Sequence, residues 1–444
     1  MRKIINVFAI GLLFMGFVFA EVKDFSYGNG QINYILTQAS DVIIQLFTSK
    51  EKLVGTIFAG NQKEGKYTYF WKGKDTDGNP VQKGNYILRI KTGRKIIKDT
   101  KFAGEGFLKF GNPSDVEIDK NGDIYVFDRG IQEKDKPNKI RVYKFHSDGK
   151  DAPDFKPIEL EDENQNYFNA RGGGPWMAVS DDKIFYGGRH CVNVHDTKGK
   201  YLYLIGGWRP QPIDPDDKTR EGKRGIYGGG AGGALGKENR IYVRNVEGAE
   251  IKVFDRTKPN GDGWLFTSNK DMVYAPVSGF YVGPSMASDS KSKIYMTGQD
   301  LRRYDDTGNE IVFRYKYNES LREPIGLALD NENMVYVAER GVIPKDETNP
   351  LPSRVSVVWD SGESLSLVKY FEFSDIKGLR DVAISPDGKS LYLLEDMDNF
   401  GYLGDKLQWP SRNIQGEGRL FKYDFSYSQI LEKKINLNGQ DLDK

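Results

Sequence analysis

Apolar and polar residues alternate in short runs along most of the chain, and one eight-residue run recurs six times. A period of two residues predicts a β-strand with one buried face. The central aromatic residues of the six copies lie 41 to 60 residues apart, a spacing typical of a radial repeat. The copies are GDIYVFDR (122–129), DKIFYGGR (182–189), NRIYVRNV (239–246), SKIYMTGQ (292–299), NMVYVAER (333–340) and KSLYLLED (389–396), with Tyr125, Phe185, Tyr242, Tyr295, Tyr336 and Tyr392 at their centres.

Each copy is flanked by further strand-like segments. A small or apolar segment such as SDVEID or RDVAIS precedes it, and a third strand such as IKVFD follows. Outer strands follow most copies, the last of them QILEKKI. Four strands in each of six repeats predict an all-β, six-bladed β-propeller over residues 105–435. The phrases PIGLALDNENMVYVAERG and DVAISPDGKSLYLLED resemble the NHL repeat and the related gluconolactonase-like propellers, a resemblance that spans most of this region.

Residues 22–92 form a separate unit with the same alternation. DVIIQLF, GKYTYFW and GNYILRI predict strands, and the segment between the last two contains the turn formers of DGNP. Several short strands in about 70 residues predict a small β-sandwich. The strand order, the Gly-x-Tyr-x-x-x-Trp run and the DGNP turn resemble the FlgD-type immunoglobulin-like (Ig-like) domain. That resemblance implies a structural or docking module.

The segments between and beyond these units are short. Residues 93–104 are a linker or a ring-closing strand, because RKIIKDTKF (94–102) has no blade of its own and a propeller needs a strand from one end of the chain to complete its last blade. Residues 436–444 are left as a C-terminal tail. The aspartates of the KDTDGNP turn lack the spacing of a calcium loop, so a hairpin turn is the better interpretation.

The N-terminal sequence and the composition constrain the location. Residues 1–20 combine Arg2 and Lys3 with an apolar run and a Val-x-Ala ending, the pattern of a cleavable signal peptide. No later segment is apolar and long enough to span a membrane. Lysine plus arginine (64) balance aspartate plus glutamate (63), so no overall charge favours nucleic acid. We therefore expect a secreted or periplasmic protein without an integral membrane segment after signal removal.

Acidic and amide residues end several of the recurring strands. Because equivalent strand ends meet at one face of a propeller, four of these side chains could surround the central pocket and bind Ca²⁺. Alternatively, each side chain bonds to the backbone of its own loop. The resemblance to gluconolactonase-like propellers supports the metal, although their inner-strand glutamate has only Glu117 as a loose counterpart. The candidate ligands are Asp128, Asn245, Glu339 and Glu395.

Arginines and aromatic residues on the same face are candidates for ligand binding. Arginines can bind a carboxylate or phosphate, and exposed aromatic rings can stack on a sugar or pack against a protein. The alternatives are solvated ion pairs and burial beneath the loops. The candidates are Arg129, Trp176, Arg189, His190, Arg340, Trp409 and Arg412.

The segment GGRHCVNVHD contains the only cysteine and two of the three histidines. His190 and His195 lie about 16 Å apart along an extended strand, which is too far to share one metal ion. We expect His195 to take the place of an aromatic strand residue, and Cys191 to lie in the turn before it.

These patterns favour a non-catalytic binding or assembly protein whose propeller face engages a glycan, a peptide or a partner subunit. The alternative is a calcium-dependent hydrolase or lyase of the gluconolactonase-like type acting on a lactone or sugar. No cofactor other than Ca²⁺ is indicated.

Overall fold

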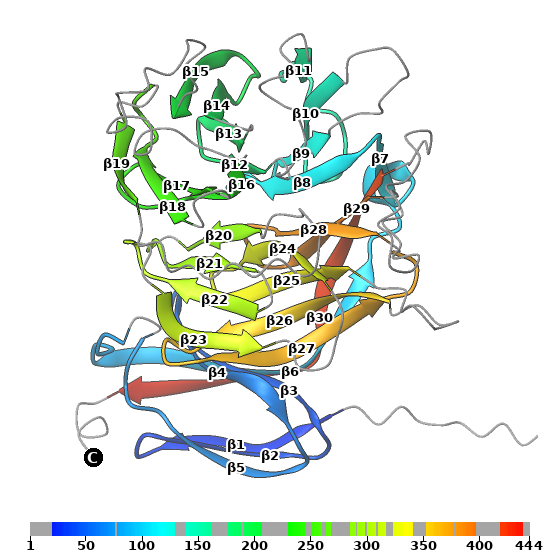
Figure 1. Ribbon diagram of the computed structural model, residues 1–444. Coiled ribbons are helices and arrows are strands. Elements are labelled where there is room, and N and C mark those ends of the chain that lie inside the picture. The colour runs from blue at the N-terminus through cyan, green and yellow to red at the C-terminus, as the bar shows by residue number, and fades with distance from the viewer. Residues whose placement is uncertain are drawn as a thin grey trace, which may run out of the picture.

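The computed structural model is an all-β structure of two units, a small sandwich and a β-propeller (Figure 1). Among the described residues the only helical element is the short 3₁₀ turn η1 (Phe102–Gly104). None of the described segments is a helix that could cross a membrane. The structure describes residues 20–75, 78–128, 139–161, 176–187, 191–206, 230–245, 250–259, 263–267, 285–289, 291–297, 300–307, 310–316, 323–340, 352–376, 378–396 and 418–437.

The N-terminal unit is the predicted sandwich. One sheet has the order β1-β2-β5, and the other contains β6-β3-β4. Alternating side chains such as Ile32, Val42 and Leu88 are fully buried between the sheets, as the two-residue period requires. The strands are β1 (Val22–Gly28), β2 (Gln31–Leu36), β3 (Ser40–Thr48), β4 (Leu53–Gln62), β5 (Gly65–Phe70) and β6 (Gly84–Lys98).

Hydrogen bonds between Asp75 and Asn79 close the segment between β5 and β6. The Asp75 carboxylate accepts a hydrogen bond from the Asn79 backbone N–H at 2.9 Å, and the Asp75 N–H donates to the Asn79 carbonyl at 2.8 Å. These bonds agree with the predicted hairpin turn.

Five further antiparallel sheets have four strands each, in which sequence order is also spatial order, and the sixth repeat belongs to a larger sheet. The six central aromatic residues all lie on the second strand of their sheets, as predicted, and each is at most 2 % exposed. The strands of the first five sheets are β8 (Pro113–Ile118), β9 (Ile124–Asp128), β10 (Lys139–Phe145) and β11 (Ile158–Glu161); β12 (Met177–Val179), β13 (Lys183–Gly187), β14 (Cys191–Asp196) and β15 (Tyr201–Gly206); β16 (Gly230–Leu235), β17 (Arg240–Asn245), β18 (Glu250–Asp255) and β19 (Trp264–Thr267); β20 (Met286–Ser288), β21 (Ile294–Met296), β22 (Asp300–Tyr304) and β23 (Glu310–Lys316); β24 (Glu323–Leu329), β25 (Met334–Arg340), β26 (Ser353–Asp360) and β27 (Leu365–Phe373).

The sheets are arranged as a closed ring. Each inner strand (β8, β12, β16, β20, β24 and β28, Leu379–Ile384) contacts the inner strands of both neighbouring sheets, and β28 contacts β8. Within the described residues the ring therefore has six inner strands, the number that the repeats predict. This arrangement is a β-propeller.

The last sheet closes the ring with a strand from the N-terminal side. Its strands are β28, β29 (Ser390–Glu395), the first part of β30 (Gly418–Leu437), and β7 (Phe107–Phe110) as the outer strand. The prediction that residues 94–102 supply this strand is therefore wrong. The strand that closes the ring is β7, which begins five residues after that segment. Residues 94–98 belong instead to β6.

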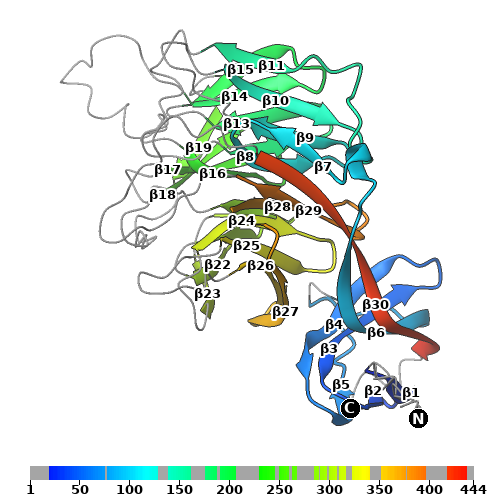
Figure 2. The same cartoon turned by 90° about the vertical axis from the view of Figure 1, so that its right-hand side faces the viewer.

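β30 continues out of the propeller and into the sandwich (Figure 2). Its residues 418–421 pair with β7, and residues 423–437 pair with β6. QILEKKI is therefore not the outer strand of the last blade, as the alternation suggested, but an edge strand of the sandwich. The two units share a seven-stranded sheet, and both β6 and β30 cross the boundaries predicted at residues 92 and 435.

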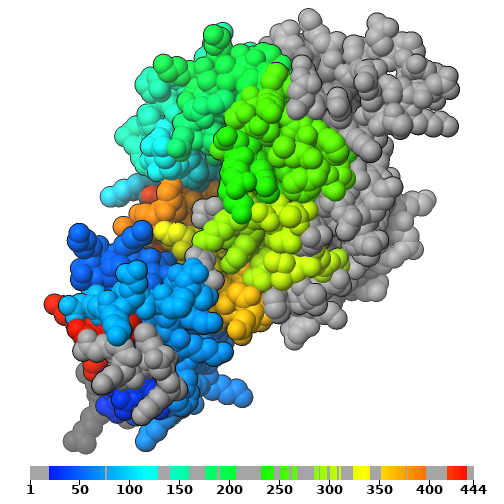
Figure 3. All heavy atoms as spheres, turned by 90° about the vertical axis from the view of Figure 1, so that its left-hand side faces the viewer, coloured from blue at the N-terminus to red at the C-terminus, as the bar shows by residue number. Residues whose placement is uncertain are grey.

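A buried contact region holds the sandwich against the fifth sheet of the propeller. Figure 3 shows the blue atoms of the sandwich against the yellow and orange atoms of the propeller. Ile43 and Ala59 of the sandwich share a hydrophobic cluster with Trp359 and Phe371. Beside this cluster, the Asp41 carboxylate accepts a hydrogen bond from Lys369 Nζ at 3.0 Å.

Arg94 of β6 is the most enclosed charge of this interface, with only 1 % of the residue exposed. Its guanidinium donates to the Tyr336 hydroxyl at 3.0 Å and to the Tyr427 hydroxyl at 3.1 Å. Glu332 lies 3.6 Å from the same guanidinium and forms an ion pair with Lys91 at 3.1 Å. A buried cation is thus held by groups from the propeller and from β30, which fixes the two units to each other.

Candidate functional site

One inner-strand residue departs from an otherwise uniform ring. In five sheets the residue paired with the central aromatic residue is alanine, whereas in the first sheet it is Glu117, paired with Tyr125. A methyl group keeps the centre of a propeller open, but a glutamate side chain extends into it. The five alanines are Ala178, Ala234, Ala287, Ala328 and Ala383.

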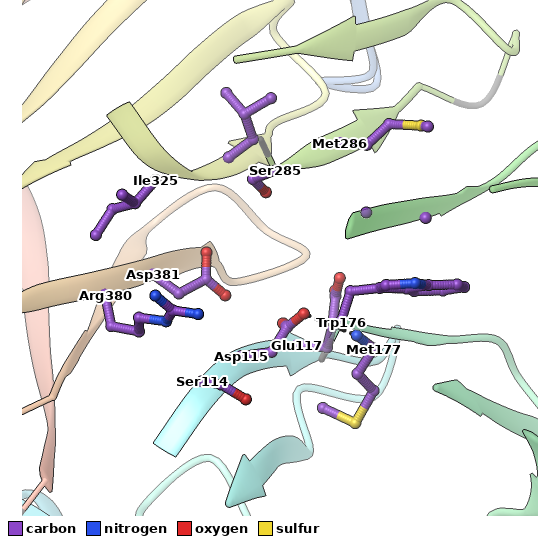
Figure 4. A pocket seen from close by; sticks show the side chains of 13 residues that line it. Ser114, Asp115, Glu117, Trp176, Met177, Ser285, Met286, Ile325, Arg380 and Asp381 are labelled. Atoms are coloured by element: carbon purple, nitrogen blue, oxygen red, sulfur yellow. Dashed lines mark hydrogen bonds between the residues drawn. The ribbon is translucent and has the colours of Figure 1, made fainter. Parts of the chain in front are cut away.

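Glu117 lines a pocket on the propeller axis. The pocket comprises about 460 Å³ of space not filled by atoms, open solvent included, and it lies between the inner strands of all six sheets. In Figure 4, carboxylate groups from β8 and β28 and the hydroxyl of Ser285 face this space. Its lining residues are Ser114, Asp115, Glu117, Trp176, Met177, Gly232, Gly233, Ser285, Met286, Ile325, Leu327, Arg380 and Asp381.

Two aspartates of the pocket tie neighbouring sheets together. Asp115 accepts a hydrogen bond from the Met177 N–H at 2.7 Å, and Asp381 accepts one from the Val116 N–H at 2.9 Å. The two carboxyl groups also interact with each other, which favours a proton on one of them.

Burial and mutual repulsion keep the pocket acids partly protonated. Desolvation, followed by the charges of Asp381 and Glu117, raises the pKa of Asp115 well above its usual range. Desolvation, followed by the charge of Asp381, raises the pKa of Glu117 to about 8. Desolvation raises the pKa of Asp381 to about 6, and backbone hydrogen bonds from Val116 and Val382 limit this rise. Near neutral pH the pocket therefore contains both carboxylic acids and a carboxylate, beside the guanidinium of Arg380.

Trp176 forms one wall of the pocket and is 4 % exposed. Its indole lies over Gly187 and Gly233, and a Cβ on either glycine would overlap the ring. The absence of side chains at these two positions makes the space for the tryptophan. Trp176 is therefore a buried wall residue rather than an exposed stacking platform.

Replacing Gly233 by alanine should displace this wall. The added methyl group would collide with the six-membered ring of Trp176, and overpacking of this kind costs about 1–3 kcal/mol. We expect G233A to lower the free energy of unfolding by that amount in urea titrations. G28A is a matched control, because a Cβ at Gly28 has no neighbour within 4 Å; equal losses in both variants would contradict the packing argument.

The candidate calcium ligands are engaged within their own sheets. Asp128 accepts hydrogen bonds from the backbone N–H groups of Gly111 and Asn112 at 3.0 and 2.7 Å. Glu339 lies 2.7 Å from Arg354, and Glu395 lies 2.6 Å from Arg419. The fourth candidate, Asn245, ends β17, and its side chain lies outside the described part of the structure.

A shared metal ion is not favoured by this geometry. Each of the three described carboxylates has partners on its own sheet or loop, as the alternative interpretation expects. In the described ranges no group of three or more His, Cys, Asp or Glu side chains is arranged to hold a metal ion.

The candidate binding residues are only partly described. Trp176 lines the axial pocket, and Arg340, at the end of β25, is buried with 5 % exposed. Neither is an exposed residue of the propeller face. The other candidates lie outside the described residues, namely Arg129, Arg189, His190, Trp409 and Arg412.

His195 occupies an aromatic position, as predicted. Its ring packs between Tyr186 and Tyr201, with centroid distances of 5.4 and 5.3 Å, and desolvation lowers its pKa to about 4. Cys191 is the first residue of β14 rather than a turn residue as predicted, and burial raises the pKa of its thiol to about 12. Both side chains are buried within the second sheet.

Sequence reasoning overlooked Asp115 and Asp381 and gave Glu117 little weight. The signal was present in SDVEID and RDVAIS, which were treated only as small or apolar strands. Aligned on the central aromatic residues, these two inner strands alone carry aspartate where the other four sheets have Trp176, Gly232, Ser285 and Gly326. An acidic side chain on an inner strand must lie at the axis, so its position identifies a candidate site.

Comparisons with known proteins match a family at the N-terminal unit and resemble solved structures over most of the chain. No curated protein sequence matches the chain. Solved structures that resemble it include the WD40 repeats of RRP9 (11 % identity, 74 % of this chain and 100 % of that chain, TM-score 0.43). Others are a luciferin-regenerating enzyme (12 %, 76 % and 97 %, 0.42) and a putative 6-phosphogluconolactonase from Bacteroides uniformis (12 %, 80 % and 88 %, 0.39). Residues 21–95 match the FlgD Ig-like domain family.

Proposed function

We propose that the chain is an exported, non-catalytic binding protein whose propeller holds a sugar group of an extracellular or periplasmic glycan at the axial pocket. The observation that carries this proposal is Glu117, which extends into the pocket where five sheets have alanine. Carboxylic acids, serine hydroxyls and a guanidinium supply hydrogen-bond donors, and the Asp381 carboxylate is an acceptor. Such a mixture suits hydroxyl groups, which both donate and accept hydrogen bonds.

The Ig-like domain supports this function because it is held rigidly against the propeller. The shared sheet and the buried Arg94 leave little freedom between the two units. A ligand on the propeller axis is therefore presented at a fixed orientation to whatever the Ig-like domain contacts. The signal-like pattern of residues 1–20, which lie almost entirely outside the described residues, supports export.

Glycan binding can be tested on the full chain with an array of immobilised glycans. We expect the wild-type protein to bind at least one glycan, and E117A to bind it at least tenfold more weakly because the central polar contact is lost. E64A, which removes an exposed glutamate of the β4–β5 turn, should bind like the wild type. Failure to bind any glycan, or equal binding by E117A, would contradict the proposal.

A sugar or lactone hydrolase is the second candidate, because neighbouring carboxyl groups with separated pKa values are typical of acid–base catalysis. In that case Glu117 is the acid and Asp381 the base. A pH-stat assay of glucono-δ-lactone hydrolysis distinguishes the candidates. It is run with EGTA and with about 1 mM CaCl₂, a concentration that fills a weak calcium site. Turnover that is lost in E117Q would favour the enzyme, and its calcium dependence would decide between the metal-assisted and the metal-independent form.

A further inference from the structure

The C-terminal part of β30 completes a domain that lies at the other end of the sequence. The FlgD Ig-like match ends at residue 95, yet residues 429–437 pair with residues 84–92 of β6 without interruption. The Val22 N–H donates to the side-chain carbonyl of Gln429 at 2.6 Å, across 407 residues of sequence. The sandwich is thus assembled from two segments that the whole propeller separates.

The added strand contributes to the core of the sandwich. Leu437 is fully buried and Ile435 is 7 % exposed, and both belong to the cluster that contains Leu88 and Ile90. Exposed residues alternate with these, among them Glu432, which bonds to Arg89 at 2.6 Å. The strand therefore fits its site through alternating apolar side chains, one charge pair and a complete backbone ladder.

Without this strand the sandwich would have an open edge. β6 pairs with β3 on its other side, so removing residues 428–437 would expose the backbone N–H and C=O groups of residues 84–92 along a buried apolar face. Such an edge is a template for another strand. Gly93, at φ 62°, lies opposite Ser428, and no side chain would fit there. This point marks the passage of β30 from propeller to sandwich.

We propose that the Ig-like domain is a strand-acceptor module, completed in each chain by residues 428–437. The groove along β6 that this segment fills would accept the same segment from a second copy of the chain. In the folded protein the tethered strand is present at high effective concentration and keeps other strands out. Until the C-terminal residues have been synthesised, the groove is empty and open to exchange. The inference does not depend on the glycan-binding function.

The test uses the full chain carrying I435D and L437D, which should release the native strand by placing two charges in the apolar core. The probe is a biotinylated peptide with the sequence of residues 428–437, SQILEKKINL. We expect the variant to take up at least tenfold more peptide than the wild type, in which the groove is occupied. A peptide that carries the same two aspartates should not bind.

The proposal is overturned if the folded variant takes up no more peptide than the wild type, or if it takes up both peptides equally. An intact propeller, shown by an unchanged near-ultraviolet circular dichroism spectrum, is the condition for counting the variant as folded. If the aspartate variant aggregates, I435A/L437A provides the same comparison, because truncating both anchors also weakens the native strand.

Discussion

Replacing Arg94 by alanine should destabilise the protein by about 3–5 kcal/mol, the usual cost of removing one partner from a buried charged network. The change removes one of the two cations that pair with Glu332, together with two hydrogen bonds to tyrosine hydroxyls. Chemical denaturation followed by circular dichroism measures the loss. K95A, at the adjacent exposed position of β6, is the control and should cost less than about 1 kcal/mol.

The pH dependence of the R94A effect provides a second check. Desolvation, followed by the charge of Glu332, raises the pKa of Asp330 to about 6 even though Arg94 lowers it. In R94A the folded-state pKa of Asp330 rises further, so ionising Asp330 costs the folded form more free energy than in the wild type. The deficit relative to wild type should therefore grow as the pH rises through 6 and above. A deficit that is independent of pH would show that Arg94 acts through packing alone.

Replacing Glu117 by glutamine should change how stability depends on pH. The pKa of Glu117 is raised from 4.5 to about 8 in the folded protein, so between these values the folded state binds more protons than the unfolded state. Its contribution is therefore fully present below pH 4.5 and is lost as the pH rises towards 8. A one-unit shift corresponds to about 1.4 kcal/mol, and partial hydration of the pocket reduces the total, so we expect about 2 kcal/mol.

The measurement is the difference in unfolding free energy between E117Q and wild type at pH 4 and at pH 8.5. E117Q should gain about 2 kcal/mol relative to wild type over this interval, because glutamine never ionises. E64Q, at an exposed turn, should follow the wild-type curve. If the E117Q and wild-type curves remain parallel, Glu117 is ionised in the pocket at neutral pH and the acid cluster has been misassigned.

Local pattern was sufficient to place the strands but not to choose their partners. Tyr125, Phe185 and their counterparts lie on second strands because a short, continuous apolar-aromatic run suits a strand that is buried on both faces. The two-residue period of QILEKKI fits a blade and the sandwich equally well. Its assignment depends on contacts across hundreds of residues, which the alternation does not encode.

The prediction of a calcium site did not consider the residues that face the candidate ligands on the third strand. The residue directly opposite each described acid on the third strand is an arginine: Arg141 faces Asp128, Arg354 faces Glu339 and Arg419 faces Glu395. Cross-strand pairs of opposite charge stabilise a sheet. Once strand register is considered, Glu339 and Glu395 are better explained as members of ion pairs than as metal ligands, while Asp128 bonds to backbone N–H groups of its own loop.

The course of β6 and β30 also bears on how the protein comes apart. The propeller chain enters its ring from β6 and leaves it along β30, and these two strands are hydrogen-bonded to each other outside the ring. Neither end of the propeller can fray without first breaking that pairing. Unfolding must therefore begin inside a blade or in the sandwich, which predicts a slow unfolding rate and long survival under protease, a resistance set by the height of a barrier rather than by equilibrium stability.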